Sequence, residues 1–212
     1  MADYFDLGSY ERPVTTSSAQ AQAWFTRGLL WAYAFNHEEA VTCFEHAIEA
    51  DPGCALAHWG LAYALGPNYN KPWAAFDPAD LSACLPRAYR ATAAASRAPG
   101  AALVERALIR ALAARYPAAE LAGDGSAWNT GYASAMREVY QAYPGDLDVA
   151  ALFADALMNL TPWALWDQRT GEPAPGSGAA WSARLTAAAD AANARATDDD
   201  LSTGSKASHG LL

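Results

Sequence analysis

Apolar residues recur at spacings of three and four along most of the first 160 residues, which is the pattern of amphipathic helices. Proline, glycine and capping residues divide the pattern into separate segments. We expect helices over about 19–35, 37–50, 55–65, 78–97, 101–117, 132–142 and 147–160. Residues 121–131 contain several glycines and are expected to form a loop. The chain is therefore predicted to be all-α.

The segment from Trp24 to Pro52 fits the tetratricopeptide (TPR) pattern, in which two helices form a hairpin of about 34 residues. The pattern positions are Trp24, Gly28 and Trp31 in the first helix, Ala40, Phe44 and Ala47 in the second, and the closing Pro52. We expect the small residues to let the helix backbones approach, and the aromatic side chains to fill the groove between them. Ala62 lies one period after Gly28. This spacing predicts a TPR-like solenoid of helical hairpins.

Three regions are expected: an irregular N-terminal arm (1–16), a TPR-like helical repeat domain (17–175), and a divergent, partly disordered tail (176–212). Within the repeat domain, the sequence Pro-Trp occurs after two of the expected helices, at Trp73 and Trp163. We expect each of these tryptophans to fold back over the end of the preceding helix.

Composition and charge limit which binding partners and which cellular location are expected. The net charge of −9, from 14 Lys and Arg against 23 Asp and Glu, disfavours nucleic-acid binding and is more compatible with a basic protein or peptide. The three cysteines have no metal-site or disulfide spacing. The N-terminus lacks the features of a signal peptide, and no apolar run approaches the roughly 20 residues that span a bilayer. A cytoplasmic protein without membrane insertion is expected.

Stacked hairpins would place their turns side by side, which suggests a polar site on one edge. The residues concerned are Asn36, His37 and Glu38 in the first turn, Asn68, Asn70 and Lys71 in the next, and Asn159 and Thr161 in a later one. In one interpretation, the asparagines cap helices and satisfy turn backbone. In the other, His37 and Glu38 bind a transition metal such as Zn, Cu or Fe.

A second candidate site is a peptide groove, which first-helix side chains of a helical-repeat array would line. The candidates are Arg27, Tyr33, His58, Tyr63 and Asp155. The sequence contains no phosphate-binding loop, HExxH motif or nucleophile elbow. No catalytic residue is therefore predicted.

The sequence also resembles a group of bacterial TPR proteins that carry an FNH-E-A turn, a DP-CA—WG junction and a GPN-N turn. Residues 35–40, 51–60 and 66–70 carry these motifs, and the resemblance covers about residues 11–175. Members generally continue into further helical repeats with His-rich stretches, whereas this chain departs from the pattern after Gly176. The resemblance leaves three hypotheses open: a protein–peptide interaction scaffold, a metal-binding protein or metalloenzyme complete only in full-length relatives, and a truncated, non-functional member.

Overall fold

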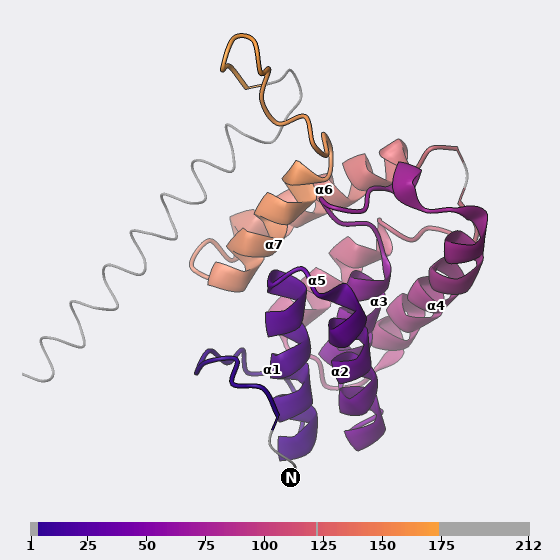
Figure 1. Cartoon of the computed structure of the whole chain (residues 1–212). Coiled ribbons are helices and arrows are strands. Elements are labelled where there is room, and N and C mark those ends of the chain that lie inside the picture. The colour runs from indigo at the N-terminus through magenta and orange to yellow at the C-terminus, as the bar shows by residue number, and fades with distance from the viewer. Residues whose placement is uncertain (1–3, 122, 174–212) are drawn as a thin grey trace, which may run out of the picture.

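The computed structural model describes residues 4–121 and 123–173, and these ranges confirm an all-helical protein (Figure 1). The α-helices are α1 (Ala19–Tyr33), α2 (His37–Ala50), α3 (Ala55–Leu65), α4 (Pro78–Arg97), α5 (Leu103–Ala113), α6 (Ser126–Ala142) and α7 (Leu147–Met158), with a short 3₁₀ helix at Trp73–Ala75. The expected tail at 176–212 lies outside the described residues. In the described part of the chain, no helix combines the length and apolarity needed to cross a membrane.

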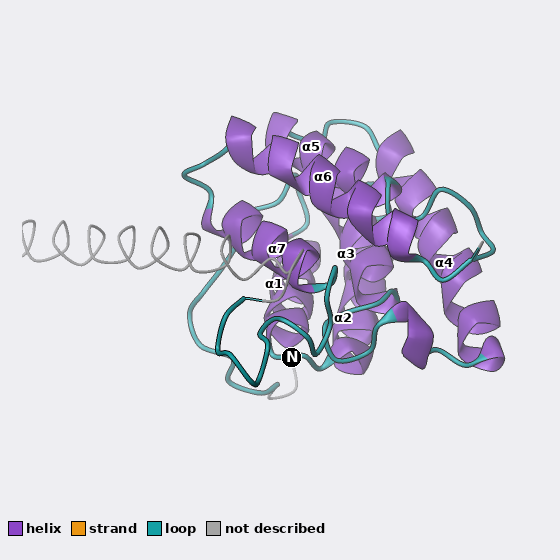
Figure 2. Cartoon of the chain, turned by 90° about the horizontal axis from the view of Figure 1, so that it is seen from above, coloured by secondary structure: helices purple, strands orange, loops and turns teal. Residues whose placement is uncertain are grey.

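Each helix packs against the next one in the chain, and α3 also packs against α1 and α5. Figure 2 shows α3 near the centre, with α5 and α6 crossing one side of it and α1 and α2 on the other. The chain then curves back toward its start. Tyr33 at the end of α1 donates a hydrogen bond to Asp148 in the first turn of α7 (2.6 Å). One hydrogen bond thus joins the end of the first helix to the start of the last described helix.

Polar side chains fix where several helices begin, as the sequence indicated. Ser18, Asn36 and Asp77 each accept a hydrogen bond from a backbone N–H in the first turn of α1, α2 and α4. The observed bounds of α4 are those predicted. The carboxylate of Glu39, in the first turn of α2, accepts the hydroxyl of Tyr4 from the arm (2.6 Å).

The packing of α1, α2 and α3 centres on the fully buried ring of Phe44. Its ring lies directly against Gly28 of α1 and Gly60 of α3, where no Cβ atom would fit without displacement. Gly60 is thus the small residue of α3 that faces α2, and Ala62, one period after Gly28, is also fully buried. Trp24 and Trp31 do not fill this junction: they are half-buried and pack against Tyr4 and Phe5 of the arm.

The prediction of a loop over 121–131 is wrong beyond residue 125, because α6 begins at Ser126. Asp124 accepts hydrogen bonds from the backbone N–H and the hydroxyl of Ser126, and Gly125 adopts a left-handed φ of 77°. A polar, glycine-rich sequence is therefore a helix start here. The turn directs Trp128 and Asn129 into the interior, where both are buried.

The two Pro-Trp turns differ. Trp73 is buried, as predicted, and its indole N–H donates to the side chain of Asn129 (3.1 Å). Trp163 was expected in the same role, but it is 65% exposed and stacks on Tyr69, with ring centroids 5.5 Å apart. The position taken by Trp73 lies beside Gly125, whose missing Cβ leaves room for the indole ring.

Candidate functional site

The predicted polar turns meet in one cavity of about 650 Å³, which we call the turn pocket. It lies between the start of α2, the end of α3, the following turn and α4. Its lining residues are Phe35, Asn36, His37, Glu38, Val41, Ala64, Leu65, Gly66, Asn68, Asn70, Lys71, Phe76, Asp80, Ala83, Cys84 and Arg87. All five candidates from the first two turns, together with Lys71, are therefore brought together. Asn159 and Thr161 do not line it, and Asn159 is buried.

Several polar groups of the turn pocket also stabilise the local backbone. Asn36 caps α2, and the side-chain oxygen of Asn68 accepts the backbone N–H groups of Asn70 (2.9 Å) and Lys71 (3.0 Å). The Lys71 ammonium forms an ion pair with Asp80 (2.6 Å) and lies over the ring of Phe76. The walls thus combine both signs of charge with aromatic and aliphatic surface.

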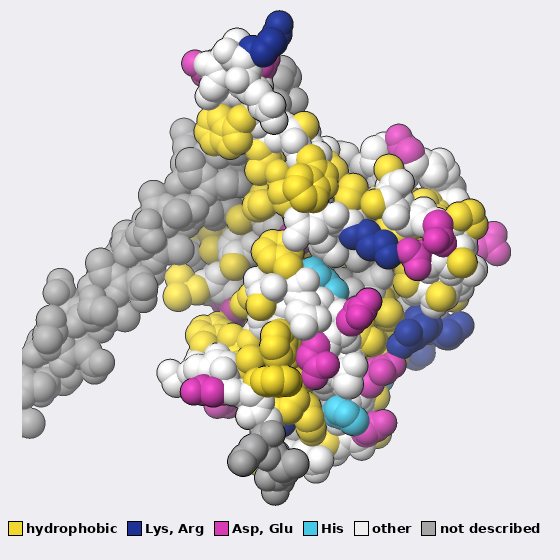
Figure 3. All heavy atoms as spheres, viewed as in Figure 1, with side chains coloured by type: hydrophobic (Ala, Val, Ile, Leu, Met, Phe, Trp, Pro, Cys, Tyr) yellow, Lys and Arg dark blue, Asp and Glu magenta, His cyan; other side chains and the backbone are white. Residues whose placement is uncertain are grey.

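Two exposed aromatic residues at this edge of the molecule have a left-handed backbone conformation. Phe35 (φ 60°) and Trp163 (φ 62°) have positive φ values and are 49% and 65% exposed. Phe35 lines the turn pocket, and Trp163 is connected to it through the stacked ring of Tyr69, which lies between Asn68 and Asn70. Figure 3 shows hydrophobic side chains gathered on this face, between the upper end of α1 and the end of α7.

The fold shifts the pKa of two titratable groups of the turn pocket, His37 and Cys84, and burial raises the pKa of the Cys84 thiol. Burial lowers the pKa of His37, whereas a hydrogen bond with the backbone of Phe35 and the negative charge of Asp155 oppose this shift. The imidazole is therefore held in its neutral form. In that form it has one nitrogen that can accept a hydrogen bond.

We expect His37 to make the fold less stable in mild acid. Because its pKa is lower in the folded than in the unfolded chain, the unfolded chain takes up the proton first as the pH falls through about 6.5. Urea denaturation at pH 7.5 and 5.5 should show a smaller loss of stability for His37→Gln than for the wild type. His46→Gln, which changes a partly exposed histidine of α2 outside the turn pocket, is the control. Equal losses in the wild type and in His37→Gln would contradict this role.

The described residues do not supply a set of metal ligands for the metal-binding hypothesis. His37 and Glu38 both line the turn pocket, but no group of three or more His, Cys, Asp or Glu side chains in residues 4–121 and 123–173 could hold a metal ion.

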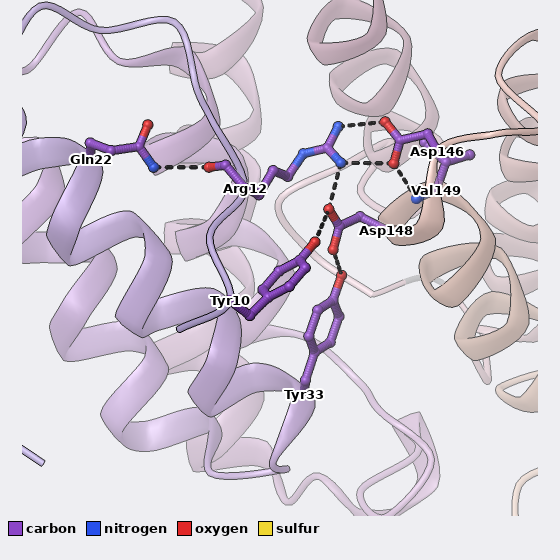
Figure 4. Close-up of polar contacts among 7 residues, drawn as sticks. All are labelled: Tyr10, Arg12, Gln22, Tyr33, Asp146, Asp148 and Val149. Atoms are coloured by element: carbon purple, nitrogen blue, oxygen red, sulfur yellow. Dashed lines mark hydrogen bonds and ion pairs between the residues drawn. The ribbon is translucent and has the colours of Figure 1, made fainter. Parts of the chain in front are cut away.

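The five predicted peptide-groove residues do not form one open surface. The guanidinium of Arg27 lies against the rings of Tyr4 and Trp24, at 4.3 and 4.5 Å from their centroids. Tyr33 is bonded to Asp148, as Figure 4 shows. His58 lines a separate cavity between α2, α3 and α4. The expected groove is therefore divided, because the arm covers one part and the curvature of the array closes another.

Tyr63 and Asp155 belong to an interior polar cluster. Tyr63 is buried and donates its hydroxyl to Asp155 (3.0 Å), which also accepts the side-chain amide of Asn159 (3.1 Å). Burial raises the pKa of Asp155, whereas Arg115 and the Tyr63 hydroxyl favour its charged form. These two predicted residues do meet, but inside the molecule.

The sequence analysis missed Arg115, which is fully buried in this interior cluster. Its guanidinium nitrogens make no hydrogen bond to any group in the described part of the chain, and its central carbon lies 4.5 Å from the ring centroid of Tyr132. The hydroxyl of Tyr132 is likewise buried without a partner there. An arginine beyond the end of a predicted helix gives no signal of burial, since arginine is rarely buried.

Comparisons with protein-family models, with curated proteins and with solved structures found no match to this chain. The resemblance to bacterial TPR proteins therefore stays a prediction. The turn pocket and its exposed aromatic residues are the observations from which a function can be argued.

Proposed function

We propose that the chain is a TPR-like helical-repeat module that binds an extended segment of a protein partner at the turn pocket. The aromatic edge formed by Phe35, Tyr69 and Trp163 would hold the segment, and one of its side chains would enter the cavity. The cavity of about 650 Å³ falls within the range of roughly 300–1,000 Å³ that is usual for ligand sites.

The backbone at Phe35 and Trp163 is the observation that carries this proposal. Phe35 follows the C-cap of α1, the position where glycine usually adopts positive φ. A bulky side chain with positive φ costs of order 1–3 kcal/mol, and such strain is concentrated at functional sites. Here the strained residues leave Phe35 49% and Trp163 65% exposed to solvent, so burial compensates the strain only in part. Exposed aromatic residues of this kind are the usual anchors of protein interfaces.

The helix arrangement supports the repeat part of the proposal. Consecutive helices pack as neighbours, and α3 also packs on α1 and α5, as expected when one hairpin stacks on the next. Phe44 between Gly28 and Gly60 supplies the close approach that the repeat pattern requires. A cytoplasmic location fits a module of this type and is part of the proposal.

A photoreactive residue at the aromatic edge tests whether a partner binds there. Benzoylphenylalanine in place of Phe35 should give a discrete adduct with a cell lysate, because the partner would lie against this ring. The same residue in place of Leu103, which is 68% exposed at the start of α5, serves as the control. Equal labelling from both positions would count against the turn pocket.

The captured segment, identified by mass spectrometry and synthesised as a peptide, then allows a decisive comparison. Phe35→Gly should weaken peptide binding by about tenfold or more, as loss of an aromatic anchor does. It should also stabilise the fold by about 0.5–1 kcal/mol, because glycine adopts positive φ without strain. Leu103→Ala should leave the affinity unchanged. Wild-type affinity in Phe35→Gly would overturn the proposal.

A further inference from the structure

A second site lies where the N-terminal arm meets α7. Figure 4 shows Arg12 of the arm pointing at Asp146 and Asp148, with Tyr10 and Tyr33 converging on the same Asp148 carboxylate. The Arg12 guanidinium donates two bonds to Asp146 (2.8 and 3.0 Å) and one to Asp148 (2.7 Å). Two hydroxyls donate to Asp148 at 2.6 Å, one from the arm and one from α1.

The acceptors of this site belong to the helical body. Asp146 caps α7 through the backbone N–H of Val149 (3.0 Å), and the side chain of Asp148 is only 7% exposed. Burial alone would raise the pKa of Asp146, but its hydrogen bonds with Arg12 and Val149 hold this pKa below its ordinary value. The site is thus a pair of carboxylates held at the start of α7, on which the Arg12 guanidinium lies.

The arm packs on the outside of the helical body, where Val14 contacts the hydrophobic core and Tyr4 and Phe5 contact Trp24 and Trp31. None of residues 4–18 is fully buried, and none belongs to a helix or strand. Segments with few buried apolar contacts open at much lower free energy than core helices do. The arm can therefore leave the site while the helices remain folded.

The contacts define the chemistry that the site recognises. In an extended chain, residues two apart lie on the same side, so Tyr10 and Arg12 both contact Asp148, although the side chain of Tyr10 is 43% exposed. Pro13 favours the extended conformation of the residue before it. The two parallel bonds to Asp146 require the planar fork of arginine, which lysine lacks. The recognised unit is therefore Tyr-x-Arg-Pro in extended form.

We propose that the arm occupies a peptide-recognition site, and that an extended Tyr-x-Arg segment of a partner protein binds there by displacing it. This inference goes beyond the proposed function, since it concerns a different surface and none of the turn-pocket residues. The arm fills the site in the free protein, so a partner segment must compete with Tyr10 and Arg12, and this competition lowers its apparent affinity.

A labelled peptide with the sequence of residues 9–16 tests the inference by fluorescence anisotropy. The protein is the full chain with Tyr10→Phe and Arg12→Gln, whose arm cannot make the contacts shown in Figure 4. We expect it to bind the peptide at least about tenfold more tightly than the wild type does, because the site is vacated. A control peptide carrying the same two substitutions should bind to neither protein. Equal affinities in a folded variant would overturn the inference.

A measurement on the wild-type chain covers the case in which the double variant fails to fold. The backbone N–H groups of Val14 and Thr15 donate to Gln22 and Glu105, so hydrogen exchange reports whether the arm is seated. Excess peptide should accelerate exchange at these two residues and leave α3 unchanged, and the control peptide should have no effect. Exchange that stays slow at millimolar peptide would reject displacement. Both measurements are independent of Phe35 and Trp163, so their failure would leave the turn-pocket proposal standing.

Discussion

Replacing Gly60 by alanine is expected to destabilise the fold by about 2 kcal/mol, although alanine is the better helix former. A Cβ at this position would lie 2.5 Å from Cδ1 of Phe44, whose ring is fully buried and contacts Gly28 on α1. The ring has little room to move toward Gly28, because it already lies so close to that backbone that a Cβ there would be 2.8 Å from the ring. The overpacking therefore exceeds the gain of about 1 kcal/mol in helix propensity. Urea denaturation followed by circular dichroism would measure the difference.

Gly131 in α6 provides the matched control for this prediction. A Cβ there would have its nearest neighbour, the carbonyl oxygen of Ala114, at an ordinary 3.6 Å. Gly131→Ala should therefore stabilise the protein by about 0.5–1 kcal/mol. In addition, Phe44→Leu should cost less in the Gly60→Ala background than in the wild type, because the two positions are in contact. Stabilisation by Gly60→Ala would show that the junction is not close-packed.

Replacing Arg115 by methionine is expected to stabilise the protein by about 2 kcal/mol. The guanidinium is fully buried without a hydrogen-bond partner among the described residues, and a buried charge in this state is costly. Methionine needs no partner, and the buried Asp155 can take up a proton once the guanidinium is gone, because burial raises its pKa. The removal of both charges from a buried ionic cluster often stabilises by about 1–4 kcal/mol. The contact with the ring of Tyr132 offsets part of the cost, which places the expected gain in the middle of this range.

Two further variants separate the loss of charge from the loss of packing. Arg110→Met removes the same charge from the exposed side of α5, so it should change the stability by less than about 0.5 kcal/mol. Arg115→Ala should be less stable than Arg115→Met, because it leaves a cavity beside Tyr132. A net loss of stability in Arg115→Met would show that Asp155 and the aromatic rings stabilise the guanidinium more than burial destabilises it.

The helices were predictable wherever local chemistry decides their limits. Asp77 followed by Pro78 combines an N-cap with a first-turn proline, and α4 begins where these residues predict. The start of α6 was missed because Gly-Asp-Gly-Ser is equally typical of a loop. Only the tertiary contacts of Trp128 and Asn129 distinguish the two conformations.

Some residues of the candidate sites could likewise be placed from the local sequence, whereas others are placed only by tertiary contacts. Asn36 and Asn68 were predicted to lie on a common edge because both occupy turns between helices, and both line the turn pocket. The placement of Tyr63 depends on tertiary contacts, because only the packing of α3 against α7 decides whether its hydroxyl faces solvent or Asp155. Helical periodicity does not predict that packing. The contact between Arg12 and Asp146 joins residues 134 positions apart and has no local signal either.

The buried hydrogen bonds of Trp73 have a consequence for how the protein unfolds. Trp73 donates to Asn129, Asn129 donates to the backbone oxygen of Asn159, and Asn159 donates to Asp155, which also accepts the hydroxyl of Tyr63. This chain of bonds leaves the turn after α3, crosses α6 and α7, and returns to α3. An array whose units touch only their neighbours can lose one hairpin at a time from an end. Here the unfolding of α7 alone would leave the buried side chains of Tyr63 and Asn129 without their hydrogen-bond partners. We therefore expect α3, α6 and α7 to unfold as one cooperative unit.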